Sequence, residues 1–499
     1  MESDAPRPPA RRRGALALSA LAVALVLGYG CLARHGPALA DEFIYLAGAK
    51  HLARSLSLDA RFYDAEAILR QGHPHHDVHA PGYVILLGAL MAVVRGTYWT
   101  AVALNVAAYV ASALLVRGLA LALGRSPRAA WASGALYLVL PAFLPYVFWA
   151  MAEVVLGALF LFTLWIGATR GDRKWGAALA GLLFGLTFLV RESALFGLPA
   201  VLGLLAGRGR VRVFLAAALA FLVLVYAPLC RGRAQGGANF WAPASGRVFG
   251  YEAVQAAAAG RLSSAATLAL GRASRNLAEL FSPATAPVEK GILGLYGLMA
   301  LGAAVARRGA RPGRLMLGGL WLGLGAMLAV LFGVYVVGQW SGFRYLMFLM
   351  PALLPSIVVP LDGTGRVLRR AALPALLAAA SLALDARTLT LLNAYKASRQ
   401  KRQEGIAAYV ERYVDTRGLT RVALTNGWLF GLRHYPLEVI SSVPDGGGDL
   451  RMLERAVWFD YLVLPGDTPL AGEMEGRQKY RRSNGEDPDP PLRVYKRLK

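Results

Sequence analysis

The chain has 499 residues, of which 56% are hydrophobic and only 17% are charged, and its mean hydropathy is +0.45. A soluble protein of this length needs a more polar surface, so the composition excludes that class and predicts a helical protein that crosses a membrane many times. The net charge of +24 does not indicate a nucleic-acid partner. Much of it lies in short loops between apolar segments, where arginine sets orientation in the lipid bilayer.

Apolar segments of membrane-crossing length alternate with basic clusters along the chain. Arg11 to Arg13 precede the first segment, which we interpret as a retained anchor because no small-residue cleavage site follows it. Placing every basic cluster on the cytoplasmic side predicts about eleven crossings of the cytoplasmic membrane. The N-terminus then lies on the inner side and the C-terminus on the outer side. The predicted spans are 14–34, 99–121, 131–150, 154–169, 176–190, 194–207, 213–230, 291–306, 315–337, 344–361 and 371–386.

One further apolar segment, residues 82–94, is too short for an ordinary crossing, and we predict a juxtamembrane or re-entrant helix there. Cys31 and Cys230 are the two cysteines, which we expect to be free thiols or packed side chains rather than a disulfide framework. The spans together predict an all-α polytopic membrane domain over residues 1–386, with outer loops at 35–81 and 231–290. Polar outer segments that gather acids and bases on one side predict an active cleft at that interface.

The tail, residues 387–499, differs in pattern from the membrane part. Its segments alternate between helical and strand patterns, which predicts a small extracytoplasmic α/β domain. No glycine-rich phosphate-binding pattern opens it, and we assign it no catalytic role. The predicted elements are an amphipathic helix at 404–414, strands at 421–425 and 461–464, and a helix at 450–456.

Asp41 and Glu42 stand together just after the first span, where like charges and nearby hydrocarbon make ionisation costly. One interpretation is that they serve as a base, hold a polar substrate or help to bind a divalent cation. The other is that they cap the helix that follows them.

Other outer residues also allow two interpretations. Glu153 begins a helix, where an acid is either a cap or a second functional carboxylate. Arg191 and Glu192 interrupt a long apolar run and can form a paired outer turn. Arg231 and Arg344 at outer helix ends either snorkel or bind phosphate.

A dense histidine cluster lies in the first outer loop, just before Pro81. Its spacing matches no structural zinc pattern, so we assign no metal ligands and expect solvated or hydrogen-bonded histidines. His79 is the one we favour as a phosphate contact, because it precedes the turn that returns the chain to the membrane. The cluster comprises His73, His75, His76, Asp77 and His79.

Several short motifs occur in a characteristic order over residues 14–360. They are Asp41-Glu42-Phe-Ile-Tyr45, His79-Ala-Pro81-Gly82-Tyr83, Glu153 after an aromatic turn, Gly181 to Gly185 leading to Arg191, Pro228 to Arg231, and Arg344-Tyr345. This ordered set resembles the GT-C glycosyltransferases, specifically the bacterial branch related to protein O-mannosyltransferases and lipid A aminoarabinose transferases. The chain departs from that family where His79-Ala-Pro81-Gly82 replaces a Lys/His-Pro-Pro-Leu stretch.

The resemblance implies transfer of a hexosyl or pentosyl group from a polyprenyl-phosphate carrier to a lipid, glycan or protein acceptor outside the cytoplasmic membrane. It implies that Asp41 is the base or acceptor-orienting acid, with Glu42 as its neighbour and Glu153 as a second acid. His79, Arg191 and Arg344 occupy places where the family holds the donor phosphate. No cofactor is required by these residues, and a divalent cation is compatible with them.

The main alternative from another class is a transporter or flippase of a lipid-linked or polar substrate. That class predicts charges near mid-span, broken helices or repeated halves. The chain instead has charges at the ends of its predicted helices and no internal repeat, which favours the enzyme. An envelope assembly protein and a ligase-type polymerase with a similar donor also remain open.

Overall fold

The structure, a computed structural model, divides into two compact units. Unit 1 consists of Met1–Arg34, Val102–Ala227 and Gly250–Asn393, and unit 2 of His35–Ala101, Pro228–Phe249 and Ala394–Lys499. Helices α5 and α19 each contribute to both units. The structure describes residues 8–56, 58, 62–64, 81–229, 256–257, 259–281, 287–305, 311–334, 343–362, 367–416, 420–424, 428–433, 438–441, 447–465, 468, 470–471, 474, 477–484 and 492–498.

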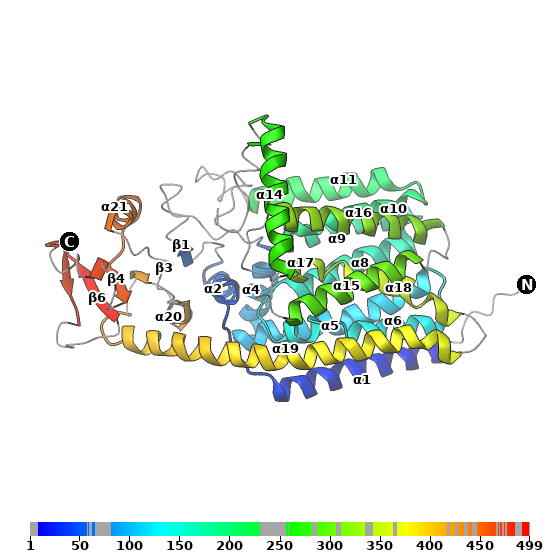
Figure 1. Cartoon of the computed structure of the whole chain (residues 1–499), viewed down its shortest axis with the longest axis horizontal. Coiled ribbons are helices and arrows are strands. Elements are labelled where there is room, and N and C mark those ends of the chain that lie inside the picture. The colour runs from blue at the N-terminus through cyan, green and yellow to red at the C-terminus, as the bar shows by residue number, and fades with distance from the viewer. Residues whose placement is uncertain are drawn as a thin grey trace, which may run out of the picture. The chain divides into compact units, whose positions relative to one another are not determined.

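Unit 1 is built from helices, most of which run side by side (Figure 1). The longer ones are α1 (Pro8–Leu32), α5 (Tyr98–Ala122), α6 (Pro127–Leu138), α8 (Glu153–Arg170), α9 (Lys174–Val190), α10 (Leu198–Ala206), α11 (Val211–Phe221), α14 (Leu262–Phe281), α15 (Pro287–Val305), α16 (Arg311–Val334) and α19 (Val367–Val410). Short helical turns connect them: α7 (Phe143–Val147), η1 (Glu192–Gly197), η2 (Leu222–Tyr226), α17 (Phe343–Leu346), η3 (Met350–Leu353), α18 (Leu354–Ile357) and η4 (Val359–Asp362).

Among the described residues, 6 helices are long and apolar enough to cross a bilayer, so the chain is a multi-pass membrane protein. They are Arg13–Leu32, Tyr98–Ala122, Glu153–Arg170, Val211–Leu229, Pro312–Phe332 and Pro374–Val410. Helix α4 (Gly82–Val94) has the predicted bounds of the short apolar segment. Its 13 residues extend only about 20 Å, against about 30 Å of hydrocarbon, and whether it enters the membrane stays a prediction.

Two predicted spans are wrong as continuous helices. The segment 131–150 contains the end of α6 at Leu138, a turn in which Ala142 has φ +75°, and the short helix α7. The segment 344–361 is a series of single turns, α17, η3, α18 and η4. Prolines explain both breaks, because proline has no N–H to donate and its ring obstructs the preceding turn. They are Pro141 and Pro145 in the first segment, and Pro351, Pro355 and Pro360 in the second.

Glycines bring α10 and α16 into close contact. A Cβ added at Gly319 would overlap the backbone carbonyl oxygen of Pro199 in α10. A Cβ added at Gly323 would overlap that of Phe196 in η1, the turn before α10. Glycine four residues apart lets two helix backbones approach closely, as is common in membrane interfaces. This contact fixes the segment that follows Arg191 along the chain.

Unit 2 contains a six-stranded mixed sheet with the strand order β1-β3-β2-β4-β6-β5. Strands β1, β3, β2 and β4 are parallel, whereas β6 and β5 are antiparallel additions at one edge. The bounds are β1 (Phe62–Asp64), β2 (Arg421–Leu424), β3 (Glu438–Ser441), β4 (Tyr461–Pro465), β5 (Tyr480–Arg482) and β6 (Leu492–Arg497), with helices α2 (Ala40–Ser55), α4, α20 (Trp428–Arg433) and α21 (Gly447–Ala456).

Both faces of this sheet are covered, as the alternation of side chains in a strand requires. On one face Leu462 and Leu464 of β4 pack in a cluster with Leu450 and Leu453 of α21. On the other face Tyr461 and Val463 pack in a cluster with Ala407 and Val410 of α19, Phe430 of α20 and Ala47 of α2. The predicted α/β character of the tail is confirmed. The helix predicted at 404–414 is the last part of α19, which ends at Val410. Strand β1 lies within residues 35–81, the segment predicted to be an outer loop.

Candidate functional site

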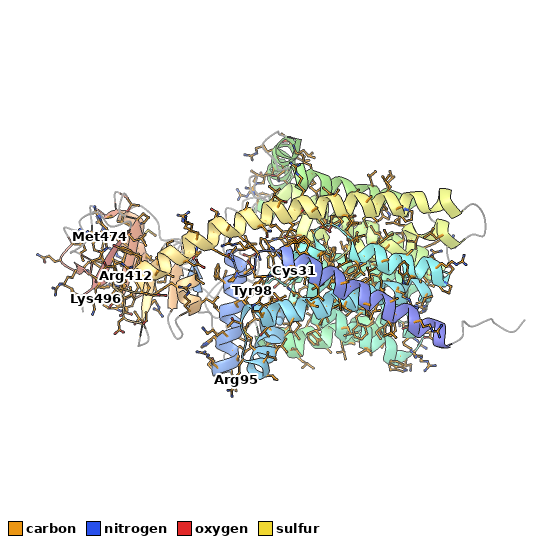
Figure 2. The ribbon with its side chains drawn as sticks, turned by 90° about the horizontal axis from the view of Figure 1, so that it is seen from below. Cys31, Arg95, Tyr98, Arg412, Met474 and Lys496 are labelled. Atoms are coloured by element: carbon orange, nitrogen blue, oxygen red, sulfur yellow. The ribbon has the colours of Figure 1, made fainter. Side chains whose placement is uncertain are left out.

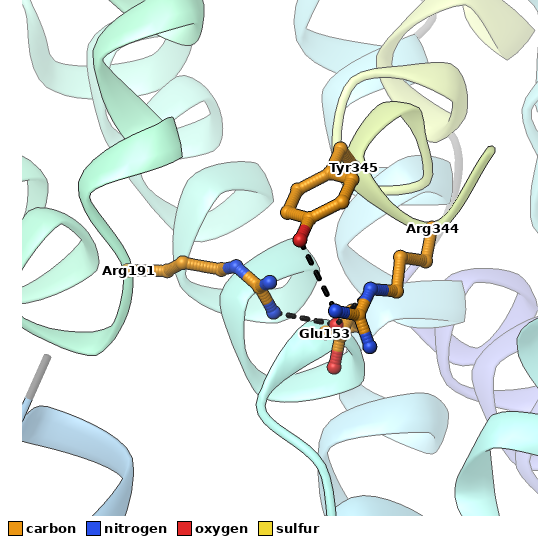
Figure 3. A network of polar contacts seen from close by, with 4 residues as sticks. All are labelled: Glu153, Arg191, Arg344 and Tyr345. Atoms are coloured by element: carbon orange, nitrogen blue, oxygen red, sulfur yellow. Dashed lines mark hydrogen bonds and ion pairs between the residues drawn. The ribbon is translucent and has the colours of Figure 1, made fainter. Parts of the chain in front are cut away.

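Glu153 is the centre of a buried ionic cluster in unit 1 (Figure 3). It begins helix α8 and is only 2% exposed. The Nη1 atom of Arg191, which follows α9, lies 2.5 Å from Glu153 Oε1. Arg191 therefore pairs with Glu153 rather than with its neighbour Glu192, whose Oε1 accepts a hydrogen bond from Tyr226 at 3.2 Å.

Arg344 approaches the same carboxylate from α17. Its Nε atom lies 3.8 Å from Glu153 Oε1, and one of its terminal nitrogens donates to the Tyr345 hydroxyl at 3.1 Å. The guanidinium carbons of Arg191 and Arg344 lie 4.7 and 5.0 Å from the centre of the Tyr345 ring. The aromatic ring thus holds both cations by cation–π attraction, in addition to their attraction to Glu153.

Two guanidinium cations, those of Arg191 and Arg344, meet at the carboxylate of Glu153. The two arginine side chains are only 12% and 15% exposed, so an anion bound there would be screened weakly by water. Two guanidinium groups with several N–H donors each are suited to phosphate.

The loop that leads into Glu153, residues 139–152, is held by side chains of three other helices. Asp385 of α19 accepts a hydrogen bond from the Ala142 N–H at 2.9 Å, which supports the positive φ of that residue. Asn105 of α5 donates to the Trp149 carbonyl at 2.6 Å. These contacts fix the loop and so the start of α8. Tyr296 of α15 also donates to Pro141 O, and Tyr109 of α5 to Leu138 O.

Asp41 and Glu42 lie in the first turn of α2, in unit 2. Asp41 is partly buried. Glu42 is fully buried, and its Oε2 accepts hydrogen bonds from the Ala38 and Leu39 N–H groups at 2.8 and 3.1 Å. Of the two interpretations of the acid pair, these contacts match helix capping for Glu42.

The far end of α2 is anchored on the C-terminal part of unit 2. Lys50 donates to the Leu432 carbonyl at 2.7 Å. Burial, together with the positive charge of Arg54, lowers the pKa of Lys50. The helix that carries Asp41 is therefore fixed at both ends.

Two predicted site residues, His79 and Arg231, lie outside the described residues, as do Cys230 and the rest of the histidine cluster. Cys31 is an exposed free thiol, as predicted. Within the described ranges, no three His, Cys, Asp or Glu side chains come together as metal ligands do.

Sequence reasoning did not select Tyr345, Asp385 or Lys396 as site residues. Asp385 and Lys396 carried a signal, because each is an ionisable residue in a long, mostly apolar helical segment, where such residues tend to be buried and to have partners. Tyr345 gave no signal of its own beyond its position next to Arg344.

No protein-family model matches the chain, and no curated protein matches it in sequence. Solved structures do match. The ArnT of Cupriavidus metallidurans bound to undecaprenyl phosphate has a TM-score of 0.57 at 13% identity, over 96% of this chain and 97% of that one. The oligosaccharyltransferase of Archaeoglobus fulgidus tethered to an acceptor peptide also gives 0.57 at 13% identity, over 90% and 69%. A further structure of that archaeal enzyme, AglB with an inhibitory peptide and a dolichol-phosphate, gives 0.53 at 12% identity, over 90% of this chain and 69% of that one. The chain therefore has the fold of the GT-C glycosyltransferases, as its sequence motifs had suggested.

Proposed function

We propose that this protein is a membrane glycosyltransferase that moves a sugar from a polyprenyl-phosphate carrier to an extracytoplasmic lipid, glycan or protein acceptor. The observation that carries the proposal is the cluster in which Arg191 and Arg344 meet at the buried carboxylate of Glu153, within a GT-C fold. The structures of that fold include one with undecaprenyl phosphate and one with dolichol-phosphate, both of which are lipid-linked phosphates.

In this proposal the two arginines bind the donor phosphate, and Glu153 orients them. Phosphate is a good leaving group, so departure needs cations and N–H donors rather than a strong acid. The bond between the anomeric carbon and the phosphate oxygen breaks, and its electron pair stays on the phosphate. Arg191 and Arg344 stabilise the charge that develops there. His79 and Arg231 stay as further proposed phosphate contacts.

Asp41 takes the acceptor side of the reaction. The acceptor hydroxyl or amine attacks the anomeric carbon and gives its proton to the Asp41 carboxylate, or is oriented by it. Glu42 is assigned to holding the start of α2, because two backbone N–H groups already occupy one of its oxygens. A divalent cation beside the acids is compatible with this scheme and is not needed for it.

The topology belongs to the same proposal. It has about eleven crossings, the N-terminus inside and the C-terminal domain outside, with membrane and tail domains divided near residue 386. The two segments broken by proline then cross as irregular chain buried within protein, which membrane proteins tolerate.

The proposal is tested by transfer in detergent. Purified protein is mixed with a panel of polyprenyl-phosphate sugars and with envelope extracts of cells that lack it, and products are identified by mass spectrometry. We expect a new glycan or glycolipid from the wild-type protein and none from Asp41→Asn, while Glu404→Gln, an exposed acid of unit 2, behaves as wild type. Detergent micelles do not separate two compartments. A signal that appears only with sealed vesicles and not in detergent would therefore support a transporter instead. Full transfer by folded Asp41→Asn would remove Asp41 from the mechanism.

A further inference from the structure

A lysine in the C-terminal part of α19 is buried in unit 2, one helical turn before Gln400, which contacts the chain that enters α2. Lys396 is 2% exposed and Glu42 is 0% exposed, and their opposite charges attract one another within this unit. Each of them would be costly to bury alone, whereas together they offset one another. The ammonium nitrogen of Lys396 also lies 5.7 Å from the ring centre of Tyr98, a second buried neighbour. Tyr98 is labelled in Figure 2.

The same face of α19 contacts the chain that enters α2. Lys396, Gln400 and Gln403 are spaced by four and three residues, so they lie on one face of the helix. Gln400 donates to the His35 carbonyl at 2.7 Å. Gly36 follows with φ +98°, a conformation that favours glycine and leads the chain toward α2. Gln403 accepts a hydrogen bond from the Leu429 N–H of α20 at 3.2 Å.

These contacts join two parts of the chain that are far apart in sequence. The connection before α2 is held by Gln400 at His35 and by Glu42 at Ala38 and Leu39. Asp41 precedes Glu42 directly in the first turn of α2, so its backbone is fixed by the same contacts.

Resting on the proposed function, we propose that Lys396 is a positioning residue: its ammonium balances the buried Glu42 and thereby holds Asp41 in place. Lys396 then acts only through Glu42 and touches no substrate. Glu42 is needed for its fit with Lys396 and not for proton transfer. Replacing both residues with neutral side chains is therefore expected to preserve function. If the Glu42 carboxylate took part in catalysis, the same double replacement would abolish function.

The test uses Lys396→Met, Glu42→Gln, the double variant, and the conservative Lys396→Arg, all in the full-length protein. The matched control is Lys401→Met, an exposed lysine of the same helix. Three readouts are compared: the envelope product restored in cells that lack the protein, at equal protein level; hydrogen exchange of the peptide 36–46; and binding of undecaprenyl phosphate to the purified protein.

We expect Lys396→Met to lower the product at least tenfold and to speed exchange at 36–46, while undecaprenyl phosphate binding stays within twofold of wild type. Glu42→Gln/Lys396→Met is expected to return product and exchange to within about threefold of wild type, because it removes the unbalanced charge. Lys396→Arg is expected to stay within the same range. Failure of Lys396→Met to accumulate, together with an active double variant, supports the pairing equally.

The inference is overturned if the double variant is no better than Lys396→Met, if neither accumulates, or if Lys396→Met makes normal amounts of product. Failure of the proposed function has a different signature: wild-type protein does not bind undecaprenyl phosphate, and Asp41→Asn restores the envelope product fully.

Discussion

Replacing Arg344 with methionine isolates the phosphate-binding role of the buried cluster. The substitution removes one of the two guanidiniums that meet at Glu153 and with it one positive charge. The Arg191–Glu153 pair at 2.5 Å remains, and methionine can pack against the Tyr345 ring. The protein is therefore expected to fold, which separates ligand affinity from stability.

The expected loss of affinity follows from the contacts that Arg344 would make. A hydrogen bond to a charged group contributes about 1.5–3 kcal/mol. Because about 1.4 kcal/mol corresponds to tenfold in affinity, undecaprenyl phosphate should bind Arg344→Met roughly 10- to 150-fold more weakly than wild type. Arg344→Lys should fall between the two, since lysine keeps the charge and loses the planar fork.

The assay is equilibrium binding of undecaprenyl phosphate to the detergent-purified protein, with undecaprenol as the ligand that lacks phosphate. Arg170→Met is the matched control. Arg170 ends helix α8, which Glu153 begins, and it is exposed. Like Arg344, it lies over an aromatic ring, in this case that of Trp175. Equal affinity of wild type and Arg344→Met for undecaprenyl phosphate would refute the reasoning. So would equal affinity of the wild-type protein for undecaprenyl phosphate and undecaprenol.

Three further predictions concern stability. Glu153→Gln leaves two partly buried guanidiniums without the Glu153 carboxylate and should cost about 3–5 kcal/mol, seen as a lower thermal midpoint in detergent. Gly323→Ala should cost about 1–3 kcal/mol by forcing α16 away from η1, because the added Cβ would overlap the Phe196 carbonyl oxygen. Gly325→Ala, whose added Cβ meets nothing within 4 Å, should not, and equal midpoints would contradict the packing account. Burial, aided by the Glu454 carboxylate, raises the pKa of Tyr480, so the stability that this tyrosine gives is present below about pH 10 and is lost as pH rises further. Tyr480→Phe should reduce that alkaline loss, measured by hydrogen exchange across β5 and β6, and an unchanged loss would exclude Tyr480 as its source.

The fold was largely predictable from sequence because its strongest signals are local. Apolar length marked the helices, and short apolar runs at 421–425 and 461–464 marked strands β2 and β4. Hydropathy alone predicted a continuous helical span at 131–150. It scores proline by its polarity and takes no account of the missing N–H, which breaks the helix.

The site was predictable as a set of residues but not as an arrangement. Glu153, Arg191 and Arg344 were each selected with two open interpretations. Their convergence on one carboxylate depends on the packing of α8, α9 and α17, which no local pattern encodes. The same holds for Lys396 and Glu42, whose relation arises only when α19 passes the start of α2.

Strand β1 has a consequence for biosynthesis. Its residues 62–64 pair with residues 439–441 of β3, so the early loop obtains its partner only after about 380 more residues have been made. At about 5–20 residues per second, the ribosome needs roughly 20–75 s for that stretch. Throughout this interval the segment that will form β1 has to stay without its partner strand β3. Premature release of the polypeptide then leaves a protein whose hydrophobic part is inserted but whose first loop never acquires its partner strand.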